Sequence, residues 1–399
     1  MISSKENYKY YSNSRISGNE SKIFLETQMP LAGGFLHNEE EKAQDLLYPL
    51  TLSFCEESCS VQVNESINPS ILFSKYSYKT GAINTLVSHL SSSANEIKKQ
   101  IPFNKILEVG CNDFTFLKNF INESELIVGV DPSDISKNNI TPEIKLINDF
   151  FSFEKSEIIK KQYGLFDTIF SSNNFAHIED IQDYSKGVSN LLKDDGSFVC
   201  EVHWVGSIIN KMQFPFIYHE HLYYYTLKSL QFLLKKSGLY VNDIQEIDIH
   251  GGSIRIFASK IEKESANVSA FIEKEKLIGL YEFNTYKEFS KKIESLKKKS
   301  KDFFNKAKKE NKNVFGYGAS GQANSLMSFF EISNDDLKFI IDDSPIKDGL
   351  ITPRNHIKIK NRNFLTENTP DYIYVLAYTF FNEIIDRNKS IECEWISPI

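Results

Sequence analysis

One short segment, residues 217–221 (IYHEH), concentrates side chains that can transfer protons. Tyr218, Glu220 and His221 supply a phenol, a carboxylate and an imidazole within four positions. An imidazole has an ordinary pKa near 6.5, so it can act as a general base at neutral pH while a neighbouring carboxylate orients it. A lone histidine is more often structural than catalytic, so this segment indicates chemistry only if other polar residues join it.

Two more polar residues, Asn173 and His177, follow an apolar run (FDTIFSS, 166–172) that we expect to form a strand. At the carboxyl end of a parallel strand, such side chains can donate hydrogen bonds to an oxygen that becomes negative during a reaction. His203 and His219 are as compatible with a structural role as with a catalytic one.

A third pattern lies between residues 106 and 131. The run ILEVGCND (106–113) predicts a buried strand that ends in a turn, and only a small residue at Gly110 permits that turn. The next predicted strand, 126–130, ends in Asp131, 21 positions after Gly110. An acidic residue at about this distance is placed to accept hydrogen bonds from ribose hydroxyls.

The loop after Gly110 lacks the further glycines of a dinucleotide-binding motif. A strand-turn-helix corner with no ligand remains the other alternative. Cys111, Asn112, Asp113 and Phe114 provide two side chains that accept hydrogen bonds and no basic group. Such a loop suits the cationic sulfonium and amino-acid tail of S-adenosylmethionine better than a pyrophosphate. We therefore expect donor contacts at Glu108, Gly110, Cys111, Asn112, Asp113, Asp131, Pro132, Asp149, Phe150 and Asn174.

A literal GxGxxG stands near the C-terminus. Gly316, Gly318 and Gly321 lie between a predicted strand and a predicted helix, and the following strand ends in Asp342 and Asp343. By itself this pattern indicates a dinucleotide site, although the acidic pair comes 26 positions after Gly316, which is late. Tightly bound NAD is therefore the main rival interpretation.

The elements that carry these residues predict an α/β protein of several domains. Short apolar runs alternate with helical stretches, which is typical of βαβ units and a largely parallel sheet. We expect a small irregular module over 1–90, the donor-binding domain over 91–260, a solvated lysine-rich helical linker over 261–312, and a smaller α/β domain over 313–399. At 399 residues the chain is too long for one ordinary core.

Composition excludes several classes of protein. Hydrophobic residues make up 41% and charged residues 25%, and no apolar run approaches the roughly 20 residues that a membrane helix needs. The net charge of -7 argues against a nucleic-acid partner. Five scattered cysteines and the lack of a signal-peptide pattern predict a cytoplasmic protein that does not bind membranes.

Short sequence motifs spread over nearly the whole chain resemble those of the sugar C-methyltransferases that act on nucleotide-linked keto-deoxysugars in bacterial antibiotic and surface-glycan pathways. They are LEVGCND (107–113), VGVDPS (128–133), FDTIFSSNNFAHIED (166–180), EVHW (201–204), IYHEHLYYYT (217–226), IHGGSIR (249–255), GYGASGQANSL (316–326) and DDSPIKDG (342–349). The resemblance implies an N-terminal zinc module, a central class I methyltransferase domain of Rossmann-like fold, and a Rossmann-like C-terminal domain that helps hold the sugar nucleotide.

The implied reaction transfers the methyl group of S-adenosylmethionine to a ring carbon beside a ketone, releasing S-adenosylhomocysteine. Methylation of that carbon needs a base that removes its proton and hydrogen-bond donors that stabilise the resulting enolate. By resemblance, Tyr218, Glu220 and His221 match active-site positions, with His221 or Tyr218 as the base, and Asn173 and His177 would bind the ketone oxygen. One tyrosine of the SKYSYKTG segment, Tyr76 or Tyr78, is expected to reach the sugar.

The resemblance also implies contacts with the nucleoside-diphosphate sugar. The GxGxxG loop would then hold the diphosphate, because backbone N–H groups at a helix start bind anions. Arg255 is expected to pair with a phosphate, although the neighbouring glycines are equally consistent with a strand bulge. The expected substrate contacts are His250, Gly252, Arg255, Gly318, Ser320, Asn324, Asp342 and Lys347.

Two departures from the family pattern have consequences. The zinc module of the family has two CxxC pairs, whereas here only Cys55 and Cys59 are close together, so we expect zinc to be lost and no metal to bind. Phe114 and Thr115 stand where the family has a glycine after Asn-Asp. Methylation of a sugar hydroxyl and a non-catalytic sugar-nucleotide-binding protein remain as alternatives. We expect a monomer or a weak homodimer.

Overall fold

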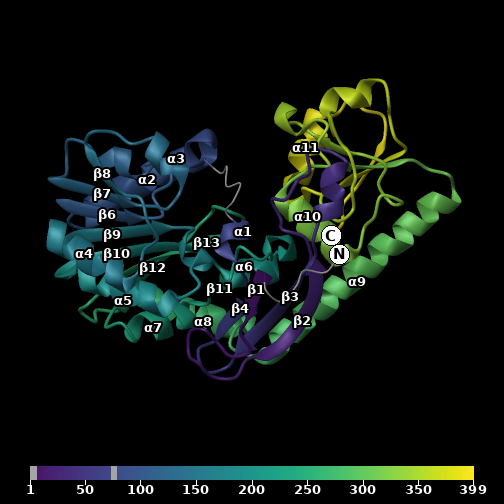
Figure 1. The fold of residues 1–399 in the computed structure, drawn as a ribbon. Helices are drawn as coiled ribbons and strands as arrows, with labels where there is room; N and C mark the ends of the chain where they lie inside the picture. The colour runs from purple at the N-terminus through teal and green to yellow at the C-terminus, as the bar shows by residue number, and fades with distance from the viewer. Residues whose placement is uncertain (1–6, 73–78) are drawn as a thin grey trace.

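The computed structural model describes residues 7–72 and 79–399, so Tyr76 and Tyr78 lie outside the described residues. Figure 1 shows one lobe formed by the middle of the chain and a second formed by the C-terminal part, with the N-terminal strands below and between them. Among the described residues, no helix is both long and apolar enough to span a bilayer.

The middle lobe contains a seven-stranded sheet in the order β12-β13-β10-β9-β6-β7-β8. β13 runs antiparallel to its neighbours β10 and β12, and the pairings among β10, β9, β6, β7 and β8 are parallel. The strands are β6 (Lys105–Val109), β7 (Leu126–Val130), β8 (Ile144–Ile147), β9 (Phe166–Ser172), β10 (Leu192–His203), β12 (Tyr240–Ile247) and β13 (Ser253–Ser259). Almost every residue of β6, β7 and β9 is buried, which explains their continuous apolar runs.

Helices connect these strands. They are α2 (Asn84–Gln100), α3 (Asp134–Asn138), α4 (Phe153–Tyr163), α5 (Ile181–Leu191), α6 (Val205–Asn210) and α7 (Leu227–Lys235). The short turns η4 (Leu117–Phe120), η5 (Phe175–His177) and η6 (Phe214–Phe216) are 3₁₀ helices. The order of the sheet places the strand before the donor loop, β6, at its centre, so the predicted α/β class is confirmed.

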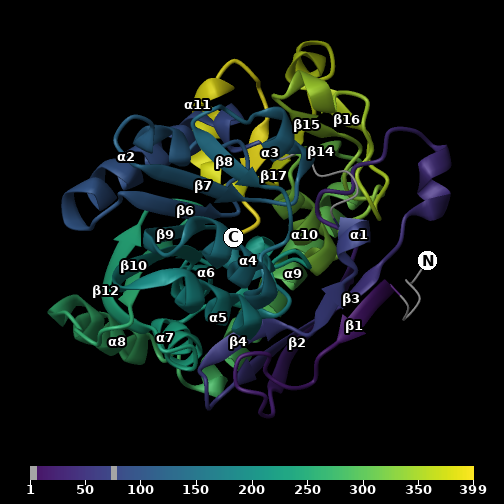
Figure 2. The same ribbon diagram turned by 60° about the vertical axis from the view of Figure 1, so that its left-hand side comes forward.

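The N-terminal module is more regular than we expected. β2 (Lys22–Met29), β3 (Tyr48–Cys55), β4 (Ser60–Val63) and β11 (Tyr223–Tyr224) form an antiparallel sheet in the order β11-β4-β3-β2. Figure 2 shows β2 and β3 lying apart from β6, β7 and β8. β3 and β4 are buried on both faces, so their sequences lack the alternation that reveals a strand.

β11 belongs by sequence to the middle lobe, yet it pairs with β4 of the N-terminal sheet. A smaller ribbon pairs β1 (Tyr8–Tyr10) with β5 (Glu65–Ile67), and α1 (Pro69–Leu72) follows. The segment 217–226 is therefore held by two parts of the chain at once.

The C-terminal lobe has a parallel five-stranded sheet in the order β16-β15-β14-β17-β18. Its strands are β14 (Val314–Tyr317), β15 (Ile340–Asp342), β16 (Ile359–Asn361), β17 (Tyr372–Val375) and β18 (Glu394–Ile396), and its helices include α10 (Gly321–Phe330) and α11 (Phe381–Arg387). This second, smaller Rossmann-like domain agrees with the prediction.

The expected helical linker consists of two helices, α8 (Ala266–Ile278) and α9 (Phe283–Lys309), separated by Gly279 in a left-handed conformation. α9 runs from the N-terminal strands to the C-terminal lobe (Figure 1). It is solvated on one face only, because Tyr286 stacks on Phe54 of β3 with ring centroids 4.5 Å apart. Because lysines dominate the sequence of α9, the buried residues on its other face, such as Tyr286, Phe289 and Ile293, were not predicted.

Candidate active site

The predicted donor corner lies where β6 ends beside β7. Gly110 has φ +83°, and a Cβ at this position would stand 2.8 Å from the Cγ atom of Asn174. Both the backbone conformation and the close contact therefore require glycine here. Asn174, which follows β9, is brought to this corner as predicted.

Several carboxyl groups lie around the corner. Glu108 is 4% exposed, and its Oε2 atom has no hydrogen-bond partner among the described residues. Burial raises the pKa of Glu108 well above its ordinary value, and the carboxylates of Asp131, Asp113 and Glu201 raise this pKa further. An unpartnered buried oxygen among acidic groups fits a cationic ligand such as S-adenosylmethionine and does not fit a pyrophosphate.

Asp131 lies at the end of β7, as predicted. Its carboxylate accepts hydrogen bonds from the Asn112 N–H (2.9 Å) and the Ser133 N–H (2.8 Å). Asn148, which the sequence did not single out, donates from Nδ2 to the carbonyls of Asp131 (2.8 Å) and Ser133 (3.0 Å). The bonds from the Asn112 and Ser133 N–H groups orient the carboxylate, and those from Asn148 fix the backbone that follows β7.

The predicted residues after β8 are open to solvent. The Phe150 side chain is 59% exposed, and Asp149 forms an ion pair with Lys155 (2.5 Å). The hydrogen bond from Lys155 and the Phe150 N–H lower the pKa of Asp149. Pro132 is also exposed. An exposed ring beside this edge can stack on a planar base, as a nucleoside ligand requires.

Three predicted donor contacts point elsewhere. Asn112 accepts a hydrogen bond from the Thr80 N–H (3.0 Å), Asp113 accepts one from the Gly81 N–H (2.8 Å), and the Cys111 side chain is buried in the hydrophobic core. Asn112 and Asp113 thus hold the segment before α2 against the donor loop. Nothing local in the sequence signals this contact across some 30 positions.

Phe114 adopts φ +63°, a left-handed conformation that bulky residues rarely take. A glycine would adopt this conformation without strain. The ring is fully buried beside Gly129 of β7 and packs in the core, so it does not fill the donor corner. The Thr115 hydroxyl donates to Asp113 (2.6 Å).

The predicted base lies in a group of histidines. The Nδ1 atom of His221 is 3.0 Å from the Phe216 carbonyl, and Nε2 is 3.1 Å from the Tyr218 hydroxyl. Because a carbonyl only accepts, Nδ1 carries the proton and Nε2 presents its lone pair to the phenol. His177 Nδ1 likewise donates to the Glu220 carbonyl (2.7 Å), and its ring lies 5.1 Å from that of His221.

His203 and His250 complete the group. Burial lowers the pKa of His221 well below 6.5, and the nearby imidazoles of His177, His203 and His250 lower this pKa further. Burial also lowers the pKa values of His177, His250 and, to about 3, His203. The lowered pKa values keep these imidazoles neutral at pH 7, so each has a nitrogen lone pair, but the same shift makes each of them a weaker base than a free imidazole.

The remaining residues of the segment have different roles. Burial raises the pKa of Glu220, which is half-buried. His219 is fully buried and bonds the Pro49 carbonyl (2.9 Å), so it anchors the segment to the N-terminal module. Asn173 has φ +52°, and its N–H donates to the Glu201 carbonyl (3.0 Å). This bond fixes Asn173 at the carboxyl edge, where it was predicted.

Arg255 does not lie where a phosphate could reach it. Its side chain is 2% exposed, its Nε donates to Glu201 (2.8 Å), and its other nitrogens contact Glu96, Gln245, Ser93 and Glu201. With every nitrogen engaged, this position does not favour the predicted phosphate contact. No local pattern predicts a buried ion pair between residues 54 positions apart.

Glu201 is the centre of this network. His89 Nε2 (2.9 Å) and the Ser172 hydroxyl (2.8 Å) bond its other oxygen. Burial alone would raise the pKa of Glu201, but the hydrogen bond from His89 and the charge of Arg255 lower it to about 2. The sequence analysis missed His89 and Ser172.

The HGGSIR turn has a structural explanation for its glycines. A Cβ at Gly252 (φ +129°) would stand 2.3 Å from the Ser207 hydroxyl of α6. The adjacent His250 has φ +50° and lies with the other histidines. Close packing against α6 therefore accounts for the glycine at 252.

The C-terminal glycine loop gathers its predicted residues around the start of α10. Ser320 caps the helix, and Asp342 accepts hydrogen bonds from the Ala319 N–H (2.7 Å) and Lys347 (3.2 Å). Gly318, with φ +94°, lies against Ala377. The carboxylate of Asp342 pairs with Lys347. A dinucleotide would need this carboxylate to accept hydrogen bonds from its ribose, so the loop does not favour NAD.

Asn324 connects the same helix to the N-terminal module. Its Nδ2 donates to the Ala32 carbonyl (2.8 Å), while its buried Oδ1 has no hydrogen-bond partner among the described residues. α10 also packs on η6, where the ring of Phe214 meets those of Phe329 and Phe330. Since η6 leads directly into the segment 217–221, the glycine loop and the histidine group share one support.

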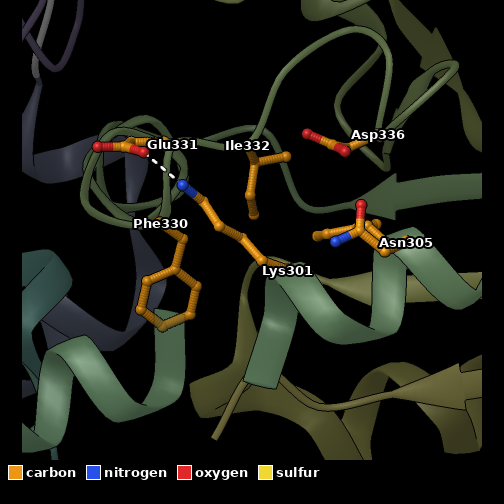
Figure 3. A pocket seen from close by; sticks show the side chains of 7 residues that line it. Lys301, Asn305, Phe330, Glu331, Ile332 and Asp336 are labelled. Atoms are coloured by element: carbon orange, nitrogen blue, oxygen red, sulfur yellow. Dashed lines mark hydrogen bonds and ion pairs between the residues drawn. The ribbon is translucent and has the colours of Figure 1, made fainter. Parts of the chain in front are cut away.

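A separate pocket of about 160 Å³ lies between α9 and the end of α10 (Figure 3). Lys301 pairs there with Glu331 (2.5 Å), and Asp336 pairs with Lys308 (2.6 Å). Because these charges are matched, the pocket offers no net charge to a ligand. None of its residues belongs to the predicted site.

Comparison with known protein families decides the activity. The methyltransferase domain family matches residues 82–244, and the C-methyltransferase C-terminal domain family matches residues 248–399. The chain is an S-adenosylmethionine-dependent methyltransferase. The methyltransferase is 29% identical over 367 residues to the C-methyltransferase NovU of Streptomyces niveus, covering 90% of the chain and 87% of the relative.

Solved structures resemble part of the methyltransferase. The magnesium protoporphyrin IX methyltransferase ChlM of Synechocystis PCC 6803 with bound SAH matches with a TM-score of 0.35 and 11% identity, covering 44% of this chain and 83% of ChlM. An S-adenosylmethionine-dependent methyltransferase from Clostridium acetobutylicum matches with a TM-score of 0.32 and 12% identity, covering 49% and 96% of the two chains.

The buried histidines predict a pH dependence of stability. Burial lowers the pKa of His219 to about 4, so the unfolded chain binds this proton below pH 6.5 and the folded methyltransferase does not. Stability is therefore full above pH 6.5 and is lost as pH falls towards 4. Relative to a His219→Asn variant, the wild type should lose roughly 3 kcal/mol of unfolding free energy over this range, measured by urea titration. A constant difference between the two proteins would contradict the burial of a neutral imidazole.

Proposed function

We propose that the methyltransferase transfers a methyl group to a ring carbon beside a ketone of a nucleoside-diphosphate keto-deoxysugar. The observation that carries the proposal is the neutral pair formed by His221 and Tyr218. Carbon is not nucleophilic until a C–H next to the ketone loses its proton, and His221, whose Nε2 atom accepts a hydrogen bond from the Tyr218 hydroxyl, is proposed to take that proton.

The residues around this pair complete the proposed reaction. His221 accepts the proton directly or through the Tyr218 hydroxyl, and the electron pair moves to the ketone oxygen. The Asn173 amide lies at the same edge and is proposed to donate a hydrogen bond to that oxygen. Glu220 is proposed to bind a sugar hydroxyl. When bound, S-adenosylmethionine supplies the electrophilic methyl group.

Glu108, Gly110, Asp131, Asp149 and Phe150 are proposed to hold the donor. The unpartnered Oε2 atom of Glu108 and the carboxylate of Asp131 are proposed to accept hydrogen bonds from the donor, and the glycine permits its close approach. Asn174, which lies against Gly110, and the exposed Pro132 are proposed to line the same corner. Donor and base then meet at the carboxyl ends of β6, β9 and β10.

The C-terminal glycine loop is proposed to bind the diphosphate of the substrate. The backbone N–H groups at the start of α10 and the Ser320 hydroxyl provide donors, and Lys347 lies beside them, paired with Asp342. Tyr378, next to Ala377, donates to the Met212 carbonyl (2.8 Å), which links this loop to the residues beside His250. In this proposal the glycine loop binds the diphosphate of the sugar nucleotide, and the histidine group binds its sugar.

Solvent exchange tests the proposal. The protein is incubated in D₂O with thymidine-, uridine- or guanosine-diphosphate keto-deoxysugars, with and without S-adenosylhomocysteine, and the sugar is analysed by mass spectrometry. We expect deuterium to enter at the carbon beside the ketone and the methyl group to be added there when S-adenosylmethionine is supplied. Methylation without exchange would instead indicate attack by a hydroxyl, and calorimetry showing no donor binding would favour a non-catalytic sugar-nucleotide-binding protein.

A further inference from the structure

Two hairpin turns of the N-terminal module face each other and have the same internal geometry. In the first, the Ser14 hydroxyl accepts hydrogen bonds from the N–H groups of Ile16 and Ser17, both at 3.2 Å. In the second, the Cys55 thiol accepts hydrogen bonds from the N–H groups of Glu57 and Ser58. Each turn therefore directs two backbone donors at the side chain that begins it.

The side chains of the two turns meet in a buried cluster. The Ser17 hydroxyl lies 3.3 Å from the Cys55 sulfur, and the Ser14 hydroxyl lies 3.4 Å from that of Ser58. Ser60 bonds Ser58 (2.8 Å) and Ser14 (3.3 Å). Ser14, Cys55, Ser58 and Ser60 are at most 2% exposed. The cluster is therefore a closed hydrogen-bonded unit.

The spacing of these residues is that of a tetrahedral metal site. Two residues separate Ser14 from Ser17 and Cys55 from Ser58, and turns with this spacing carry the ligand pairs of structural zinc sites. Zinc in such sites takes thiolate or imidazole ligands, whereas this cluster has one thiol and otherwise hydroxyls. The residues present do not fit zinc.

Cys59 does not supply a second thiol to the cluster. It follows the turn with φ +49°, and its sulfur lies 3.5 Å from the Glu56 carbonyl. The closely spaced Cys55 and Cys59 are thus not a ligand pair, and the partner of Cys55 within its turn is Ser58.

We propose that Ser14, Ser17, Cys55 and Ser58 occupy the four ligand positions of a lost metal site, and that their hydrogen bonds now hold the two turns together without metal. The turns dock at opposite ends of α7. The Thr226 hydroxyl at its start donates to the Cys59 carbonyl (2.8 Å), and Lys236 at its end donates to the Ile16 carbonyl (2.9 Å). The cluster thereby keeps the N-terminal sheet, which pairs with β11, against the catalytic lobe.

Restoring the missing thiols tests the proposal. We expect the triple variant S14C/S17C/S58C to bind one zinc per chain by mass spectrometry and, with Co²⁺, to show the visible absorption of a tetrahedral thiolate site. Its thermal midpoint should rise with zinc and fall with a chelator, whereas the midpoint of the wild type should respond to neither. A folded triple variant that takes up no zinc or cobalt would overturn the assignment of the four positions.

Variants with less risk of misfolding test the wild-type cluster. Ser58→Ala should lower the thermal midpoint by several degrees because Ser14 and Ser60 lose a buried partner, while the matched change at the exposed Ser12 should leave it unchanged. Wild-type protein that retains one equivalent of zinc after dialysis, and unfolds at a lower temperature once it is stripped, would overturn the metal-free proposal. An unchanged thermal midpoint in Ser58→Ala would overturn the proposal that the hydrogen bonds of the cluster hold the two turns together.

Discussion

Replacing His221 with alanine is expected to lower kcat by roughly 10²–10⁴-fold and to leave the dissociation constant of S-adenosylmethionine nearly unchanged. The reason is spatial: His221 bonds Tyr218 and the Phe216 carbonyl, whereas the proposed donor contacts lie around Gly110. Steady-state kinetics with a keto-deoxysugar nucleotide and calorimetry with the donor measure the two quantities separately. Equal losses in both would show that His221 shapes the donor site instead of removing a proton.

A neighbouring histidine provides the matched control. His219 stands two positions away but is buried against the Pro49 carbonyl, so His219→Asn should reduce stability first and change kcat of the folded protein little. Tyr218→Phe then separates two routes for the proton. If the phenol is the group that touches the sugar, this variant loses as much turnover as His221→Ala. If the imidazole acts directly, it loses much less.

Replacing Arg255 with leucine is expected to cost about 3–5 kcal/mol of unfolding free energy, because it leaves the fully buried carboxylate of Glu201 without its cation. Urea unfolding at pH 8 measures the loss. Lys137 supplies a matched surface control, since it also pairs with a carboxylate, Asp134, but both side chains are mostly exposed. Lys137→Leu should leave stability unchanged.

Removing the other member of the pair should be less harmful. In Glu201→Gln the amide oxygen still accepts hydrogen bonds from Ser172, and Arg255 keeps its contact with Glu96. The order of stability should therefore be wild type, Glu201→Gln and then Arg255→Leu. If Arg255→Leu proved as stable as the wild type, Arg255 would not be the cation that compensates Glu201, and its predicted phosphate contact would deserve renewed consideration.

Local patterns were sufficient for much of the central lobe. Gly110 and Asp131 were found because a strand, a glycine turn and a second strand follow each other within 30 positions, and each carries its own periodicity. The N-terminal sheet escaped detection for the opposite reason. β3 and β4 are covered on both faces, and β11 joins them from more than 150 positions away, so neither alternation nor proximity marked them.

The sequence by itself determined the α/β class, the donor corner and the residue types of the histidine segment, because these depend on the order of apolar runs, glycines and polar residues along the chain. Only the tertiary structure decided that Arg255 forms an ion pair with Glu201 and that Asn112 and Asp113 hold the segment before α2. It also decided that the turn of Ser14 and Ser17 faces the turn of Cys55 and Ser58. The physical reason is that a polar side chain takes its role from the group it meets, and in these cases that group comes from a distant part of the chain.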